Sequence, residues 1–110
     1  MTTGAGTIAA LQDVQAVVGQ IVARFHPQKV ILFGSYADGS QTEDSDVDLL
    51  VVMEAAEQPL HAAARIAAAI DHPFPLDIVV WTPARLNESL ERKGAFVTGV
   101  MEQGVVLYEA

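Results

Sequence analysis

The sequence predicts one small α/β (α+β) domain, in which helices pack on a mixed β-sheet. Short apolar runs bounded by turn residues indicate buried strands, and stretches with apolar residues at helical spacing alternate with these runs. No linker, repeat or low-complexity tract divides residues 1–110. With 51% hydrophobic residues, a chain of this length can bury a core without disulfides, and the absence of cysteine excludes both disulfides and thiolate metal sites.

The first half of the chain predicts a helix followed by two strands. Apolar residues recur at helical spacing from Ile8 to Phe25, so we expect an amphipathic helix that ends before Pro27. The apolar run Val30–Phe33 predicts a buried strand that ends at a glycine, and a second strand is expected over Val47–Met53. About a dozen polar residues separate these strands, and long loops of this kind often carry function.

The middle of the chain predicts a helix and a third strand. The alanine-rich segment Leu60–Ile70 has the composition of a helix, and two prolines, Pro73 and Pro75, force a break after it. The segment Leu76–Trp81, with the sequence LDIVVW, predicts the third strand.

The C-terminal part predicts two further helical stretches and an edge strand. Thr82 followed by Pro83 is a helix N-cap with proline at the first helical position, and this helix should run to about Arg92. After an interruption near residue 94, a last helical stretch is expected over Phe96–Gln103, followed by an edge strand over Val105–Tyr108.

The charge of the chain limits its partners. Fourteen acidic residues against six basic ones give a formal charge of -8, and such a surface repels the phosphate backbones of DNA and RNA. Residues 1–11 carry no Lys or Arg ahead of the apolar residues, and no apolar run approaches the ~18 residues of a membrane span. We therefore expect a cytoplasmic protein without direct nucleic-acid or membrane binding.

Half of the acidic residues lie within twenty positions, in a region without any Lys or Arg. A charge run of this kind is usually a solvated loop. The alternative is a metal site, because neighbouring carboxylates repel each other and a divalent cation removes the repulsion. The acidic residues of this stretch are Asp38, Glu43, Asp44, Asp46, Asp48, Glu54 and Glu57.

The segment that carries chemistry contains two aspartates at the start of the second predicted strand. Asp46 and Asp48 are two residues apart, so their carboxylates point to the same face, whereas Val47 points to the other. Mg²⁺ suits such a pair, because it accepts few protein oxygens and completes its octahedron with water and substrate phosphates. If the third strand pairs beside the second, Asp77 joins them, either as a further metal ligand or as the group that takes a proton.

Gly34 and Ser35 directly follow the first predicted strand. Glycine lets a phosphate approach the backbone, and the serine hydroxyl and amide can donate hydrogen bonds to it. Together with the aspartates, this pair is suited to phosphoryl-type chemistry on a metal-bound nucleotide. Neither the Walker-type G-x-x-x-x-G-K-[ST] motif nor G-x-G-x-x-G occurs in the sequence. Trp81 and Tyr36 could each stack on a base, but we expect Trp81 in the core and Tyr36 at the surface or in a lid.

Residues 32–52 resemble the minimal nucleotidyltransferases of the polymerase-beta superfamily. The shared pattern is Gly34-Ser35, a ten-residue spacer and Asp46-x-Asp48, with Asp77 as a third aspartate on a later strand. The resemblance implies a polymerase-beta-like fold and Mg²⁺-dependent transfer of a nucleoside monophosphate from a nucleoside triphosphate. By resemblance, the glycine and the serine hold the triphosphate, and the three aspartates are the metal-binding and catalytic residues.

Stand-alone members of this size resemble the antitoxins of prokaryotic toxin–antitoxin pairs. Their partner is an HEPN-domain ribonuclease, and the resemblance implies transfer of AMP from ATP to a tyrosine of that toxin within a hetero-oligomer. The short chain leaves no room for an acceptor-binding domain, so we expect the acceptor to be another protein. The alternative hypothesis is a non-catalytic binding module that neutralises its partner by complex formation.

One position departs from the family pattern. Members commonly carry Arg or Lys where this chain has Asp38, and an acid there cannot attract a triphosphate. We therefore expect either a compensating cation, with Arg85 and Arg65 as candidates, or weaker nucleotide binding.

Overall fold

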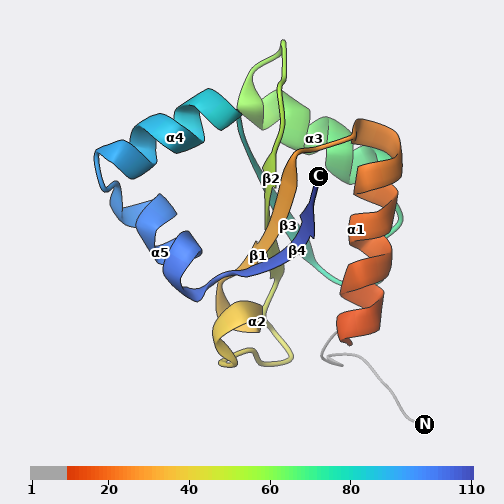
Figure 1. The fold of residues 1–110 in the computed structure, drawn as a ribbon. Coiled ribbons are helices and arrows are strands. Elements are labelled where there is room, and N and C mark those ends of the chain that lie inside the picture. Colours follow the sequence, from red (N-terminus) through yellow and green to blue (C-terminus); the bar gives the residue numbers. More distant parts are fainter. Residues whose placement is uncertain (1–9) are drawn as a thin grey trace, which may run out of the picture.

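The computed structural model describes residues 10–110, which form one four-stranded sheet and five helices. Figure 1 shows the sheet between two groups of helices. The strands are β1 (Lys29–Phe33), β2 (Val47–Val52), β3 (Leu76–Trp81) and β4 (Val105–Glu109). The helices are α1 (Leu11–Phe25), α2 (Ser35–Asp38), α3 (Pro59–Ala69), α4 (Pro83–Glu91) and α5 (Ala95–Gln103).

The predicted fold class is confirmed, and the strands and helices lie within one or two residues of their predicted positions wherever the chain is described. The predicted beginning of the first helix at Ile8 lies outside the described residues. The polar segment between the first two strands contains α2, a single helical turn that ends at Gly39. The sequence had predicted only a long loop there.

The sheet has the order β3-β2-β1-β4 and is mixed. β1 pairs with β2 and β4 in antiparallel fashion, whereas β2 and β3 are parallel. The predicted edge position of the last strand is confirmed. The beginning of β2, the beginning of β3 and the end of β1 therefore lie at one end of the sheet, beside α2 (Figure 1).

Side chains on the two faces of the sheet build two separate cores. Val47, Leu49 and Val51 of β2 lie in a cluster with buried residues of α1 and α3, while Leu50 and Val52 lie in a cluster with α4 and α5. Because both faces of β2 are covered, its last four residues, Leu49–Val52, are a continuous apolar run rather than an alternating one. Asp48 has the same parity as Leu50, so it belongs to the face that α4 and α5 cover.

Local signals fix the ends of several helices. Thr82 accepts a hydrogen bond from the backbone amide of Arg85 at 3.2 Å through its side-chain hydroxyl, so the predicted N-cap of α4 is confirmed. His26 adopts a left-handed conformation that ends α1, and its amide donates to the Val22 carbonyl oxygen. Within residues 10–110, no helix combines the length and apolar character needed to cross a membrane.

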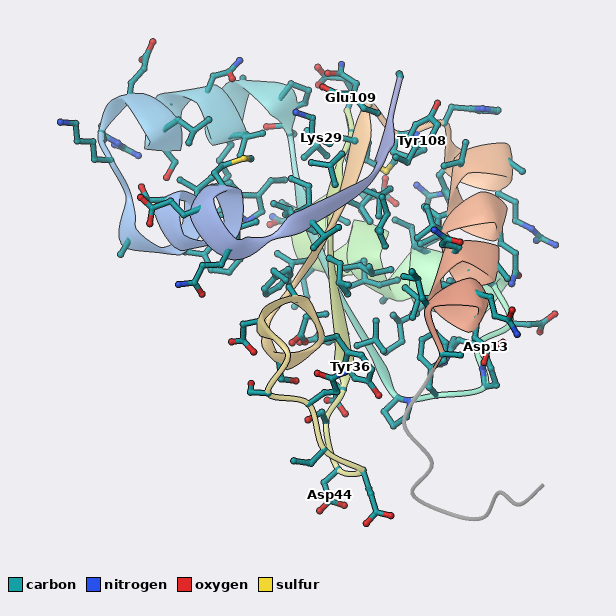
Figure 2. The ribbon with its side chains drawn as sticks, turned by 60° about the horizontal axis from the view of Figure 1, so that its bottom comes forward. Asp13, Lys29, Tyr36, Asp44, Tyr108 and Glu109 are labelled. Atoms are coloured by element: carbon teal, nitrogen blue, oxygen red, sulfur yellow. The ribbon has the colours of Figure 1, made fainter. Side chains whose placement is uncertain are left out.

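The far end of the sheet is held by the C-terminal strand. Lys29 and Glu109 form an ion pair at 3.2 Å, and Figure 2 shows these two side chains next to each other. The amide of Ala110 donates to the carbonyl oxygen of Gln28 at 2.9 Å. This end of the sheet is opposite to the one at which the predicted site residues gather.

Candidate functional site

The parallel pairing of β2 and β3 brings the predicted aspartates together. Asp48 and Asp77 are direct partners across the two strands, as expected if the third strand pairs beside the second. Asp46 lies one residue before β2, and the next amide, of Val47, donates to the Pro75 carbonyl oxygen at 2.9 Å. The pairing between β2 and β3 therefore extends to the residue directly after Asp46.

The carboxylates of Asp46 and Asp77 are close enough to affect the pKa of Asp48. Asp48 is half-buried, whereas Asp46 and Asp77 are exposed. Burial raises the pKa of the Asp48 carboxyl, and the negative charges of Asp77 and then Asp46 raise it further. A cation placed among the three carboxylates would remove this repulsion.

The donor set at this end of the sheet is suited to a hard divalent cation. Among residues 10–110, no three His, Asp or Glu side chains already form a complete set of ligands around one point. Mg²⁺ does not need such a cage, because it is usually held by one or two carboxylates together with water and substrate phosphates. Asp46, Asp48 and Asp77 offer only carboxylate oxygens, so they have the chemistry that this ion requires.

Gly34 lies directly against the carboxylate of Asp48. A Cβ atom built at position 34 would collide with Oδ2 of Asp48, so only glycine leaves room for this carboxylate. The backbone of Gly34, with φ of 76° and ψ of -155°, also lies in a region that is almost restricted to glycine. The two parts of the sequence pattern, glycine-serine and the aspartate pair, are thus in contact in the folded chain.

The helical turn α2 places Ser35 beside this contact. Ser35 begins the turn, which is closed by hydrogen bonds from the Asp38 amide to the Gly34 carbonyl oxygen and from the Gly39 amide to the Ser35 carbonyl oxygen, at 3.2 and 3.0 Å. The predicted site residues Gly34, Ser35, Asp46, Asp48 and Asp77 therefore gather at one end of the sheet. Their roles in binding metal and nucleotide stay predictions.

The exposed carboxylate of Asp38 lies in the same turn. Its Oδ1 accepts hydrogen bonds from the amide and the hydroxyl of Ser40, at 2.9 and 2.6 Å. These bonds lower the pKa of Asp38, the side-chain bond most. A negative charge therefore does stand beside Gly34 and Ser35.

Neither of the two candidate compensating cations is at the site, so this alternative was wrong, and weaker nucleotide binding stays a prediction. Arg65 is held by Glu57 through its Nε atom at 2.8 Å, and its guanidinium lies 5.2 Å from the ring centre of Phe25. Arg85 lies 4.0 Å from the ring centre of Trp81, which pairs with Val52 at the opposite end of the strands. Positions 77 and 81 are four steps apart along an extended strand, a distance of about 13 Å.

The aromatic predictions had different outcomes. Trp81 is buried, as expected, and packs in the core between the sheet and the helices α4 and α5. Tyr36 is not simply at the surface: it is half-buried and packs against the core on the other face of the sheet. The loop acids Glu43 and Asp44 are exposed, as the solvated-loop interpretation of the charge run implies, and Figure 2 shows Asp44 at the tip of the loop.

A cavity next to Gly34 was missed by sequence reasoning. It has a volume of about 240 Å³ and lies between the end of β1 and α5, where Phe33, Phe96 and Gln103 contribute to its walls. Phe33 and Phe96 meet edge to face, with ring centres 5.4 Å apart. No local pattern could have linked residue 33 to residues 96–104, because only the packing of α5 on the sheet brings them together.

Two comparisons with known sequences give matches over most of the chain. The family model "Nucleotidyltransferase domain" matches residues 16–102. The "Putative protein adenylyltransferase MJ0604" of Methanocaldococcus jannaschii is 30% identical over 82 residues, which cover 74% of this chain and 78% of that protein.

Two solved structures share the fold. A "putative nucleotidyltransferase" from Sulfolobus solfataricus superposes with a TM-score of 0.63 at 20% identity, over 90% of this chain and 79% of the other. A toxin–antitoxin with AMP-PNP gives a TM-score of 0.57 at 24% identity, over 91% of this chain and 75% of the other. At these identities, the likeness demonstrates a common fold.

Proposed function

Because the chain belongs to the nucleotidyltransferase domain family, we propose that it is a Mg²⁺-dependent protein adenylyltransferase that acts as an antitoxin. It transfers AMP from ATP to a tyrosine of a partner protein, an HEPN-domain ribonuclease toxin, within a cytoplasmic hetero-oligomer. The observation that carries this proposal is the gathering of three aspartates and the Gly34-Ser35 turn at one end of the sheet. The relative named as a protein adenylyltransferase supports a protein acceptor.

The residues divide the work of the reaction between them. Gly34 and Ser35 bind the triphosphate through a close backbone approach and hydrogen-bond donors. Asp46 and Asp48 hold Mg²⁺, which when bound neutralises charge on the phosphates during transfer. The half-buried position of Asp48 keeps its carboxylate fixed against Gly34, so the phosphates and the acidic pair are positioned by one contact.

The transfer itself balances without any further reactant. The tyrosine oxygen of the acceptor attacks the α-phosphorus of ATP, the new O–P bond forms, and the bond from the α-phosphorus to the oxygen bridging to the β-phosphorus breaks. Pyrophosphate leaves with that oxygen. Asp77 is exposed on the edge strand β3, so it is accessible to an incoming acceptor and takes the phenolic proton.

The test is transfer of label from ATP to the partner. We expect the purified protein, incubated with Mg²⁺, α-³²P-ATP and the product of the neighbouring gene, to label that product and raise its mass by one AMP. Asp46→Asn and Asp48→Asn should abolish labelling, because each removes a carboxylate charge from the site. Asp44→Asn is the matched control, since it makes the same change at an exposed loop position and should keep full transfer.

The same experiment separates catalysis from simple binding. If the Asp46→Asn and Asp48→Asn variants still protect cells from the toxin, and the wild type produces no AMP mass shift, the protein neutralises its partner by complex formation alone. That outcome would overturn the proposed activity and leave only the family assignment in place.

A further inference from the structure

The cavity between β1 and α5 lies next to the acidic site and on the same face of the sheet. Phe33, in its wall, is the direct strand partner of Asp48, and Gly34, also in its wall, contacts the carboxylate of Asp48. Phe33 packs with the cluster that α4 and α5 form with the sheet, which is the face to which Asp48 belongs. A molecule that has its phosphate group at Gly34 and Asp48 therefore reaches the cavity without crossing the sheet.

The charges around the cavity disfavour phosphate inside it. Among the described residues that line the cavity, none is a Lys or Arg, and the one charged side chain is the ionised Asp38. A triphosphate carries several negative charges and would be repelled here, whereas at Gly34 and Ser35 a Mg²⁺ ion held by Asp46 and Asp48 would offset that repulsion. The cavity is therefore suited to an uncharged part of a ligand.

The walls offer two kinds of contact that a nucleobase uses. Phe33 and Phe96 provide aromatic surface, and Phe96 is 41% exposed, so its ring is accessible to a ligand. Gln103 provides an exposed amide, a group that can both donate to and accept from a base edge. Bases bind to proteins mainly through such stacking and edge contacts.

The volume of the cavity is suited to one part of a nucleotide rather than to the whole molecule. Pockets that enclose a whole drug-sized ligand usually measure roughly 300–1,000 Å³. The volume of about 240 Å³ is smaller, so the cavity holds one portion of a nucleotide while the remainder lies over Gly34 and Ser35.

We propose that this cavity binds the nucleobase of the nucleoside triphosphate, with Phe33 and Phe96 as the stacking surface and Gln103 as the residue that contacts the base edge. The inference rests on the proposed function, because it assumes that the triphosphate lies at Gly34 and Ser35. It adds a base-binding site formed by α5, a helix that contributes no residue of the Gly-Ser and Asp-x-Asp pattern.

Gly99→Leu tests the proposal by filling the cavity. Gly99 lines the cavity from α5, and a Cβ atom there would meet no heavy atom within 4 Å, so the helix accepts a side chain at this position. Gly19→Leu on α1 is the matched control, because Gly19 also has open space around it and lies far from the cavity walls. Both variants replace a helical glycine with a better helix former, and both should fold.

The measurement is isothermal titration calorimetry with two probes, Mg-ATP and magnesium tripolyphosphate. We expect Gly99→Leu to weaken Mg-ATP binding about tenfold or more, the scale of one lost base stack, and to leave tripolyphosphate affinity unchanged. Gly19→Leu should match the wild type for both probes. Gln103→Ala should weaken Mg-ATP binding in the same selective way, by about threefold to tenfold.

The possible results separate this inference from the function on which it rests. Unchanged Mg-ATP affinity in Gly99→Leu would overturn the base site while the wild-type affinity keeps the proposed function intact. Equal loss of both probes in a variant with wild-type circular dichroism would also overturn it, because the cavity would then hold phosphates. A wild-type protein that binds neither probe would overturn the proposed function itself.

Discussion

At Gly34, both the backbone conformation and the contact with Asp48 depend on the absence of a Cβ atom. The sequence suggested that a glycine here admits a phosphate, and the structure adds that it admits the carboxylate of Asp48. A side chain at this position would meet two separate penalties, one from φ and ψ and one from the collision. Gly39, five residues later, provides a comparison, because it has a positive φ of 84° but open space around it.

We expect Gly34→Ala to lower the free energy of unfolding by about 2–4 kcal/mol and to reduce nucleotide transfer strongly, because Asp48 must move. Gly39→Ala should cost only about 1 kcal/mol, since it pays for the left-handed backbone alone. Urea unfolding of both variants, followed by a transfer assay, measures the difference. Equal destabilisation by the two changes would mean that the contact with Asp48 has no energetic consequence.

Asp38, unlike Gly34, departs from the family pattern. Since Arg65 and Arg85 lie at the other end of the sheet, the structure provides neither of the predicted cations to offset its charge. We therefore expect weaker attraction for phosphates at this turn than in a member with Arg or Lys.

We expect Asp38→Arg to tighten the binding of both Mg-ATP and magnesium tripolyphosphate by roughly threefold to tenfold, because it replaces repulsion with attraction. Asp38→Asn removes the charge and can still accept the hydrogen bonds from Ser40, so it should give an intermediate affinity. Calorimetry at low salt measures both. An affinity of Asp38→Arg equal to or weaker than that of the wild type would contradict this account.

At the scale of elements, capping residues and breaks determine where helices begin and end. Proline at the first position starts both α3 and α4, and the threonine that caps α4 was evident from the sequence. The short turn α2 was harder to predict, because it has only four residues and no buried side chain. Its conformation depends on the strands that flank it rather than on its own propensity.

Thr82→Ala should lower the free energy of unfolding by about 1 kcal/mol, because the amide of Arg85 loses its side-chain acceptor at the start of α4. Thr82→Ser keeps a hydroxyl and serves as the control, with an expected change of a few tenths of a kcal/mol. Thermal or urea unfolding distinguishes the two. If serine and alanine destabilise equally, the hydrogen bond at 3.2 Å contributes nothing to α4.

At the scale of the whole molecule, the sheet joins two cores that share β2. Leu49 lies in the core with α1 and α3, and Leu50 lies in the core with α4 and α5, and both side chains are fully buried. The site residues lie at one end of strands that contribute side chains to both cores, so the geometry of the site depends on both.

We expect Leu49→Ala and Leu50→Ala each to lower the free energy of unfolding by about 2–5 kcal/mol, the usual cost of a cavity at a fully buried leucine. Because one strand carries both residues, unfolding should remain a single transition in each variant, followed by circular dichroism and tryptophan fluorescence from Trp81. Separate transitions for the two probes would show that the two cores unfold independently.

The sequence by itself determined the kinds of element and their order, and it singled out the residues that we predict to carry chemistry. Val30–Phe33 and Leu76–Trp81 were evident as strands because buried strands are continuous apolar runs. The Gly34-Ser35 and Asp46-x-Asp48 pattern was evident because its spacing spans only one connection between neighbouring strands. These features are local in the chain, so a local pattern is enough to predict them.

Only the tertiary structure decided what depends on contacts between distant segments. The parallel register that sets Asp77 opposite Asp48 goes with α3, which connects the two strands and packs on one face of the sheet, and the cavity at Phe33 follows from the packing of α5 on the sheet. The positions of Arg65 and Arg85 were decided in the same way, by an ion pair and an aromatic ring. Sequence spacing does not predict these long-range contacts, because they form when helices bury their apolar faces against the sheet.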